Sequence, residues 1–353
     1  MEHPGMRQVA HEINVAVPAD TVHRLIAEVE NWPRIFPSVI HVAYEEAPEG
    51  EERLRIWETA PPKEDGPSAK GSPSAEGSSS AEGGPTAEGG PTAEGSSSTE
   101  GWPRSRPLRR IVEPAALRVN FQHLVTEAHV AGIGGAWLVE PLGENASRVR
   151  LLHEFRAEGD APGALDRIGA EVDRGARAQL AALKENAERD VADAGLTFSF
   201  EDTVLVDGSA KDVYAFINEA NLWSQRLPHV ATVRLEEDTP GLQTLEMDTR
   251  AKDGSLHTTK SYRVTFPHHH IAYKQVTLPA LMTLHTGHWT FTDTDEGVAA
   301  TSQHTVTLNT DNIETVLGPD ATLTDARTYV HTALSTNSRA TLTHAKAFAE
   351  GRR

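Results

Sequence analysis

The residues best suited to chemistry in this chain lie on one predicted strand, 258–264. A strand has a period of two, so Ser261 and Arg263 share one face and Tyr262 lies on the other. An arginine that points into a cavity is a fixed cation with several N–H donors, and such a group stabilises a developing enolate or carbonyl oxyanion. An arginine on an exposed edge strand, or one paired with a carboxylate, has only a structural role. The pattern alone leaves both interpretations open.

Aromatic and polar residues elsewhere are candidates for the wall of such a cavity. Four tryptophans could hold a flat ligand there, and ordinary core packing is the alternative for each. Asn337 lies on an apolar stripe of a long predicted helix, where a polar residue indicates either a cavity or a buried hydrogen bond. We count Tyr262 among the ligand-contacting candidates as well. The four tryptophans are Trp32, Trp137, Trp223 and Trp289.

The elements that must position these residues occur twice in the chain. A predicted helix followed by Trp and Pro is found at 22–39 and again at 213–230. The separation is constant, because 223 − 32 and 228 − 37 both give 191. We therefore interpret the chain as two copies of one module.

Further along, the correspondence continues at a shorter separation. The offset falls by 191 − 153 = 38, which is close to the length of a stretch of six-residue repeats at 68–103. That stretch therefore lies in an insertion, 61–106, within the first module, and we predict domains at 1–192 and 195–353. The corresponding pairs are Arg110 with Arg263 (153 apart), Trp137 with Trp289 (152 apart) and His153 with His304 (151 apart).

The six-residue repeats, such as SAEGSS and TAEGGP, lack the aliphatic residue that each turn of a parallel β-helix needs for its core. Without apolar burial, nothing offsets the entropy lost on ordering the chain. We predict a disordered tether, and a spacer without a function of its own is the simplest interpretation of it.

Each module is predicted to contain a strand, two short helices, six strands and a long helix, at 164–189 and 322–349 respectively. An antiparallel sheet that curls around one long helix buries the apolar faces of such a set. The expected fold class is therefore α+β, in tandem, with a cavity between the curved sheet and the long helix.

Histidines and bulk composition narrow the chemistry. His153 and His304 are candidates for acid/base or ligand-contacting groups, and a satisfied strand histidine is the alternative. Near His285 and His288 the sequence places no third ligand, so we expect no metal.

The chain has no cysteine, which excludes disulfides and a thiol nucleophile. A net charge of −18 argues against binding nucleic acid or an anionic membrane, and without a signal or membrane segment we expect a cytoplasmic protein.

Several of these segments together resemble the two-domain aromatase/cyclases of bacterial type II polyketide synthases. The resemblance covers both modules and omits only residues 61–106. The segments are 32–37 (WPRIFP), 135–137 (GAW), 149–155 (VRLLHEF), 261–263 (SYR) and 337–340 (NSRA).

This resemblance implies the helix-grip fold of the START and Bet v 1 group. It implies an enzyme, without a redox or metal cofactor, that folds a poly-β-ketone tethered to an acyl carrier protein. The enzyme promotes an intramolecular aldol condensation and dehydrates the first ring to an aromatic one, usually after one ketone has been reduced. Other synthase subunits are further implied partners. A cluster at Arg104, Arg106, Arg109 and Arg110 is the predicted docking patch for the acidic carrier, and solvated arginines that follow a loop are the alternative interpretation.

The resemblance also implies site residues. The family's cavity arginine falls on Arg263 and Arg110, its serine on Ser261 and its helix asparagine on Asn337. The first module departs from this pattern with Leu108 and Gly175 at the serine and asparagine positions. The second module is therefore the better-equipped one. A lipid or hydrophobic-ligand carrier without chemistry, or a subunit that only shapes the chain, are the rival interpretations of the same fold.

Overall fold

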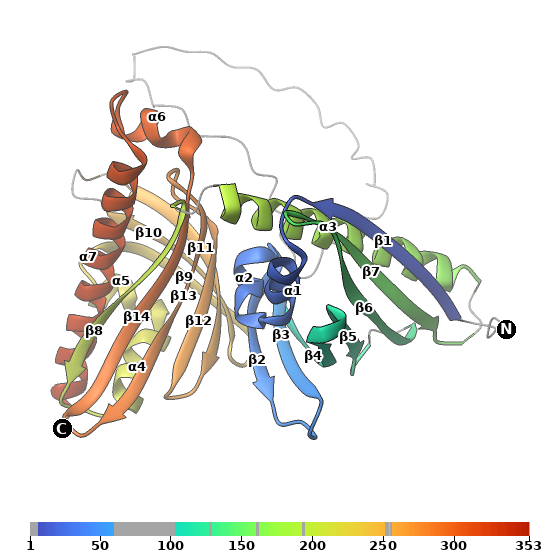
Figure 1. Ribbon diagram of the computed structural model, residues 1–353. Coiled ribbons are helices and arrows are strands. Elements are labelled where there is room, and N and C mark those ends of the chain that lie inside the picture. The colour runs from blue at the N-terminus through green and yellow to red at the C-terminus, as the bar shows by residue number, and fades with distance from the viewer. Residues whose placement is uncertain are drawn as a thin grey trace, which may run out of the picture.

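The computed structural model describes residues 6–59, 103–126, 129–159, 162–192, 195–250, 254 and 256–352. Within these ranges the chain forms two seven-stranded antiparallel sheets with helices packed on them (Figure 1). Most of the six-residue repeat lies outside the described residues, so its disorder stays a prediction. Residues 103–106, which we expected in the insertion, begin a strand of the first sheet instead.

The first half of the molecule, residues 6–192, carries the sheet with strand order β1-β7-β6-β5-β4-β3-β2. Its long helix α3 packs against β1 and β7. The elements are β1 (Met6–Val15), α1 (Ala19–Ala27), α2 (Trp32–Ile35), β2 (Val39–Glu45), β3 (Glu52–Thr59), β4 (Pro103–Glu113), β5 (Arg118–His123), β6 (Val130–Gly143), β7 (Ala146–Ala157) and α3 (Ala164–Ala192).

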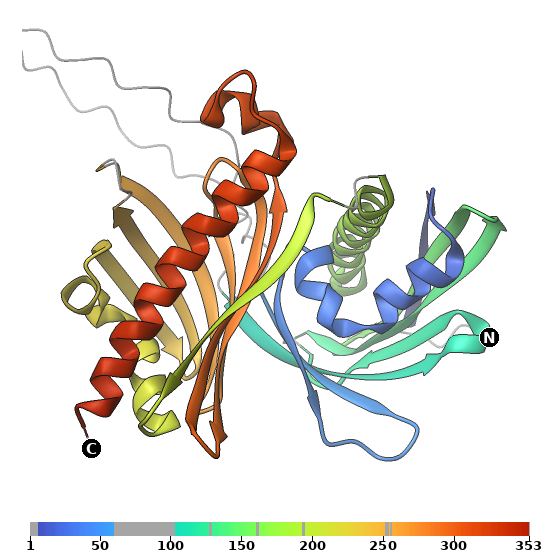
Figure 2. The ribbon, with the colours of Figure 1, turned by 60° about the vertical axis from the view of Figure 1, so that its left-hand side comes forward.

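The second half, residues 195–352, repeats this order as β8-β14-β13-β12-β11-β10-β9, with the long helix α7 across the sheet (Figure 2). The tandem α+β fold predicted from the sequence is confirmed. The elements are β8 (Thr197–Val206), α4 (Ala210–Asn218), α5 (Trp223–Arg226), β9 (Val230–Thr239), β10 (Leu242–Arg250), β11 (Leu256–Phe266), β12 (His270–Thr277), β13 (Met282–Thr294), β14 (Gly297–Leu308), α6 (Ile313–Leu317) and α7 (Leu323–Glu350).

Local chemistry sets where α7 begins. The Thr322 side chain accepts a hydrogen bond from the Asp325 backbone N–H, and the Asp325 carboxylate accepts one from the Thr322 backbone N–H. This reciprocal capping satisfies two of the backbone donors that a helix start leaves unpaired, which is worth about 1 kcal/mol. The short helix α6, which the sequence did not predict, precedes this start.

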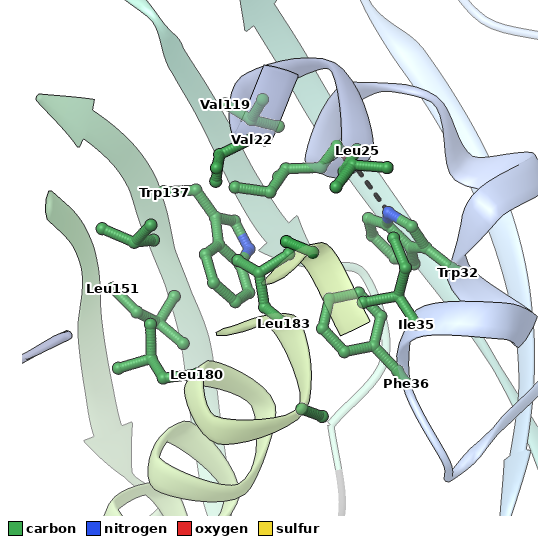
Figure 3. Close-up of a cluster of buried hydrophobic side chains, with 14 of the residues drawn as sticks. Val22, Leu25, Trp32, Ile35, Phe36, Val119, Trp137, Leu151, Leu180 and Leu183 are labelled. Atoms are coloured by element: carbon green, nitrogen blue, oxygen red, sulfur yellow. Dashed lines mark hydrogen bonds between the residues drawn. The ribbon is translucent and has the colours of Figure 1, made fainter. Parts of the chain in front are cut away.

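The four tryptophans are buried in the apolar cores. Trp32 donates its indole N–H to the Ile26 carbonyl at 3.0 Å, and Trp223 makes the corresponding bond to Phe216 at 3.2 Å. Around Trp137, side chains from α1, α2 and α3 close the core of the first half (Figure 3). Each indole therefore has a packing role, whatever else it does.

The two halves meet where β2, an edge strand of the first sheet, lies against β11 and β12 of the second sheet. An apolar cluster joins them, with Ile40 and Trp57 from the first half and Tyr262 and Val264 from the second. Exposed edge strands invite pairing with other chains, and this contact covers one of them.

Candidate active site

In each half the apolar core is divided into two clusters, with polar side chains between them. Along β14, Ala300 belongs to one cluster and Val306 to the other, and buried Ser302 and His304 lie between them on the same face. Along β7, His153 likewise lies between Leu151 and Phe155, which belong to different clusters. Because polar groups are buried only where they are hydrogen-bonded or used, we call each of these zones a polar seam. The second-half seam comprises Asp202, Arg263, Tyr273, His285, Ser302, His304 and Ser338, and the first-half seam His11, Glu58, Arg106, Arg110, His123, His153 and Asp173.

Strand register aligns the second-half seam into a row. Arg263 lies opposite Tyr273, Tyr273 opposite Gly287, and Gly287 opposite His304. Side chains that face each other across neighbouring strands are within contact distance. At Gly287 a Cβ atom would lie 2.5 Å from the Tyr273 hydroxyl, so the missing side chain lets the phenol cross β13 and reach His304.

The phenol and two imidazoles of this row form one hydrogen-bonded network. The Tyr273 hydroxyl lies 2.9 Å from His304 Nδ1, and His285 Nε2 lies 3.0 Å from the same atom. His304 Nε2 lies 3.1 Å from the Ser302 hydroxyl, and His285 Nδ1 lies 2.6 Å from Gln275 Oε1. Tyr273 is the partly exposed member of this network, whereas both imidazoles are buried.

Burial keeps this network neutral. It lowers the pKa of His285 to about 3 and that of His304 to about 4, and it raises the pKa of Tyr273 far above its ordinary value. At neutral pH the phenol therefore remains a donor and each imidazole has one donor and one acceptor nitrogen. Such a set is neutral at rest and can exchange a proton with a bound carbonyl or hydroxyl, with a transient charge on an imidazole.

Buried histidines make the stability of the protein depend on pH. Burial lowers the pKa of each of them from 6.5 to about 4 or below. At pH values between the pKa of the folded protein and that of the unfolded chain, the unfolded chain binds protons that the folded protein does not. The free energy of unfolding therefore falls as pH falls. The six are His41, His123, His153, His270, His285 and His304.

We therefore expect the melting temperature to drop steadily between pH 6.5 and pH 4.5, with each histidine contributing up to about 1.4 kcal/mol per pH unit. Calorimetry at constant ionic strength measures this slope. A His304→Gln variant should show a shallower slope than the parent. A melting temperature that is flat over this range would contradict the expectation.

Arg263 lies at the end of the row, buried under Trp223. Its Nη2 donates to the Ile217 carbonyl at 2.8 Å, and its guanidinium carbon lies 5.5 Å from the Trp223 ring centroid. Ile217 belongs to the last turn of α4, where unpaired carbonyls favour a cation. Burial lowers the pKa of Arg263 to about 10, which leaves it charged at neutral pH. Its buried Nη1 has no hydrogen-bond partner among the residues that the structure describes.

Arg110 occupies the corresponding place in the first half, but its charge is compensated. It donates to the Glu52 carboxylate and to the Ala27 carbonyl, and its guanidinium carbon lies 5.9 Å from the Trp32 ring centroid. The residue opposite Arg110 in the next strand is Phe121, which has no hydroxyl. In the second half, the corresponding positions hold the neutral Gln243 and Tyr273.

The first-half seam contains other polar pairs. Arg106 donates to both carboxylate oxygens of the buried Glu58, at 2.7 and 3.1 Å. His11 Nε2 lies 2.7 Å from the Asp173 carboxylate, on α3. His153 contacts the Phe121 ring at 5.5 Å between centroids, and its Nδ1 is buried without a partner.

Two predicted docking arginines are interior residues, which corrects the expected basic patch. The Arg110 side chain is only 1% exposed, and Arg106 is committed to Glu58. Arg104 and Arg109 keep 39% of their side-chain surface exposed. Arg109 points to the opposite face of β4 from Arg106 and Arg110, because successive side chains of a strand alternate. Arg104 shares the face of Arg106 and lies 3.4 Å from the same Glu58 carboxylate, near the exposed start of the strand.

The other predicted site residues fall into two groups. Ser261 shares the face of Arg263 and is partly exposed, and Asn337 is partly buried on α7. Tyr262 is buried against the first half, on the opposite face from Arg263, so we leave it out of the site. Beside Asn337, Ser338 donates to the Asp202 carboxylate at 2.8 Å.

Sequence reasoning missed Tyr273 and the pairing of Asp202 with α7, and it considered His285 only as a metal ligand. One signal was available for the first of these. Gly135 and Gly287 precede Trp137 and Trp289 by two residues in both modules. A glycine repeated within a strand indicates that another group passes close to the backbone.

Replacing Gly287 with Ala should therefore destabilise the protein. The new Cβ would lie 2.1 Å from the Gln303 carbonyl oxygen and would push Tyr273 from His304, so we expect a loss of about 2–4 kcal/mol. Gly175→Ala is the matched control, because a Cβ there meets nothing within 4 Å and Ala is favoured in a helix by about 1 kcal/mol. Urea unfolding measures the free energy of unfolding of both variants, which should fall in Gly287→Ala and rise in Gly175→Ala. A Gly287→Ala variant as stable as its parent would contradict the close packing of this row.

No metal site or membrane helix accompanies these seams in the part of the chain that the structure describes. Within it, no group of three or more His, Cys, Asp or Glu side chains is arranged to hold a metal ion. None of its helices is long and apolar enough to cross a membrane.

Known proteins resemble the chain over nearly its full length. A family model described as polyketide cyclase / dehydrase and lipid transport matches residues 197–349. The granaticin polyketide synthase bifunctional cyclase/dehydratase of Streptomyces virginiae is 45% identical, over 95% of this chain and 97% of the relative. The corresponding actinorhodin protein of Streptomyces coelicolor is 35% identical over 99% of both chains.

Solved structures agree with these relatives. The di-domain ARO/CYC BexL, from the BE-7585A biosynthetic pathway, is 49% identical and superposes with a TM-score of 0.82 over 98% of this chain and 99% of its own. StfQ, from the steffimycin pathway, is 31% identical, with a TM-score of 0.79 over the same shares. The chain therefore belongs to the family of di-domain aromatase/cyclases, the bifunctional cyclase/dehydratases of polyketide synthases.

Proposed function

We propose that this protein acts on a poly-β-ketone bound to an acyl carrier protein, in the cytoplasm and beside the other synthase subunits. It folds the chain, promotes an intramolecular aldol condensation and dehydrates the first ring to an aromatic one. The proposed domains are 1–192 and 195–353, and the second carries the chemistry. The observation that supports this choice is the row Arg263–Tyr273–Gly287–His304, in which a buried cation and a proton relay lie on neighbouring strands of one sheet.

The aldol step needs an enolate and a carbonyl that accepts negative charge. We assign charge stabilisation to Arg263, through its free Nη1, and to the Tyr273 hydroxyl. Donors aimed at a developing oxyanion are worth about 3–4 kcal/mol each. His304 accepts a proton, directly or through Tyr273, as the enolate forms, and it returns this proton to the alkoxide that the new carbon–carbon bond creates. Ser261 and Asn337, both partly exposed and facing the interior, orient the remaining carbonyls.

Dehydration uses the same relay in reverse. His304 first accepts a proton from the carbon between the carbonyl and the carbinol, the Tyr273 hydroxyl donates a proton to the departing hydroxyl group, which leaves as water, and the protonated His304 returns one proton to Tyr273. Loss of water from a β-hydroxy ketone and the gain of aromaticity drive the step without an oxidant. The first half contributes less in this scheme, because Glu52 compensates the charge of Arg110 and Phe121 replaces the phenol.

The family model's description also includes lipid transport, so a carrier role is the second candidate. Reconstitution distinguishes the two. The purified protein is mixed with a synthase that releases the unaided chain, and ring patterns are compared by mass spectrometry and NMR. An enzyme changes the ring pattern at substoichiometric amounts. A carrier changes nothing below a one-to-one ratio, and that result would overturn the proposal.

A further inference from the structure

Lys274 is a buried lysine that belongs to the second half but makes its hydrogen bonds to the first. From the outer face of β12, its ammonium donates to the carbonyls of Pro33 at 2.8 Å, Phe36 at 2.9 Å and Val39 at 3.0 Å. All three acceptors lie within the end of α2 and the start of β2. No residue of the second half therefore supplies an acceptor for these three bonds.

The geometry requires the charged form of this lysine. An ammonium has three hydrogens to donate and a neutral amine only two, so three carbonyl acceptors select the ammonium. Burial lowers the pKa of Lys274 to about 7. Hydrogen bonds from the ammonium to three carbonyls favour the charged form.

The segment that Lys274 contacts carries part of the interior of the first half. Trp32 and Phe36 meet edge to face at 5.8 Å, and Phe36 lies 6.2 Å from Trp137 (Figure 3). Trp32 in turn lies under Arg110. These three aromatic rings form a wall beside the first-half seam. The backbone of the segment that carries Trp32 and Phe36 is held by the hydrogen bonds from Lys274 of the second half.

The same strand serves the second-half seam. Strand alternation places Tyr273 and Gln275 on the inner face of β12, in the hydrogen-bonded network, and Lys274 between them on the outer face. A shift of β12 that moves the phenol also moves the ammonium. One short piece of strand thus contacts both seams.

We propose that Lys274 is a positioning residue through which β12 fixes α2 and the aromatic wall of the first half, so that the two seams are mechanically coupled. This inference rests on the contacts of Lys274 and not on the chemistry assigned above, so each can fail without the other. It predicts that loss of the ammonium loosens a segment more than two hundred residues away in the sequence, in the opposite half of the molecule.

Hydrogen exchange of the full-length protein tests the coupling. In a Lys274→Met variant, which keeps the length of the side chain, amides in residues 29–45 should exchange at least about tenfold faster, because charge-assisted hydrogen bonds that hold the segment are gone. The N–H groups of Phe36 and Val39, bonded to Trp32 and Phe36, report on it directly. Amides of α3 should keep their rates.

Lys346→Met is the matched control. Lys346 also donates to a backbone carbonyl, that of Leu205 at 2.9 Å, but within its own half. Its replacement should leave residues 29–45 unchanged. Should Lys274→Met not fold, Lys274→Gln, which retains two N–H donors, should give an intermediate acceleration. Unchanged exchange at 29–45, or a uniform acceleration over both halves, would overturn the coupling.

Discussion

Replacing Tyr273 with Phe should lower the rate of first-ring aromatisation by about 10²–10³, with little change in folding. The hydroxyl belongs to the network with His304 and His285, and its loss removes both the proposed oxyanion donor and the relay. The fold tolerates Phe at this place, because Phe121 occupies it in the first half. Reconstituted synthase assays, with product ratios read by mass spectrometry, measure the effect.

Tyr329→Phe is a suitable control for this variant, since Tyr329 is exposed on α7 and lies outside both seams. The reciprocal change, Phe121→Tyr, adds a hydroxyl beside His153 and Arg110. If Tyr273→Phe kept the parent's rate and product ratio while Phe121→Tyr altered them, the assignment of the chemistry to the second half would be reversed.

The second large effect is expected at the arginines. Arg263→Ala should abolish first-ring aromatisation, whereas Arg110→Ala should only reduce it. The reason is charge: Arg110 is compensated by Glu52, and Arg263 lies opposite the neutral Gln243 with one donor unused. Loss of a donor aimed at the oxyanion costs about 3–4 kcal/mol, or a factor of about 10²–10³ in rate.

Both arginines also donate hydrogen bonds from a strand to carbonyls at the end of a helix. The stability of each variant must therefore be measured before reaction rates are compared. Arg263→Lys keeps the cation and one donor to Ile217, and it should fold even if Arg263→Ala does not. Circular dichroism and melting define which variants are comparable. Full activity of folded Arg263→Ala and Arg110→Ala variants would remove the arginines from the mechanism and favour the carrier role.

The fold was predictable because its signals are local or repeated. Helix α1 and strand β1 follow from periodicity, and the constant separation of Trp32 and Trp223 is enough to indicate the duplication. Helix α6 was missed, since five residues contain too little periodicity to distinguish a helix from a loop. β4 is longer than predicted because Pro103 and Pro107 argue against a strand locally, while pairing with β3 imposes one.

The site was predictable only in part. The equivalence of Arg110 and Arg263 follows from the repeat, but their burial under α2 and α5 depends on tertiary contacts that sequence spacing does not encode. The network of Tyr273, His285 and His304 depends on the register of three strands. Register is set by pairing across long sequence separations, so these residues could not be grouped from their positions alone.

The contact between the halves has a consequence for assembly. An edge of one copy lies against the face of the next, which is a head-to-tail arrangement, and such contacts extend into open filaments unless something stops them. Lys274 lies on the face of the second copy that the edge of the first copy contacts. Strand register gives Gln122 the corresponding position in the first copy, where it accepts a hydrogen bond from Arg109 at 2.7 Å. The first copy thus presents an amide that is already bonded to Arg109 within its own sheet, whereas the second copy presents an ammonium bonded to the carbonyls of the other half.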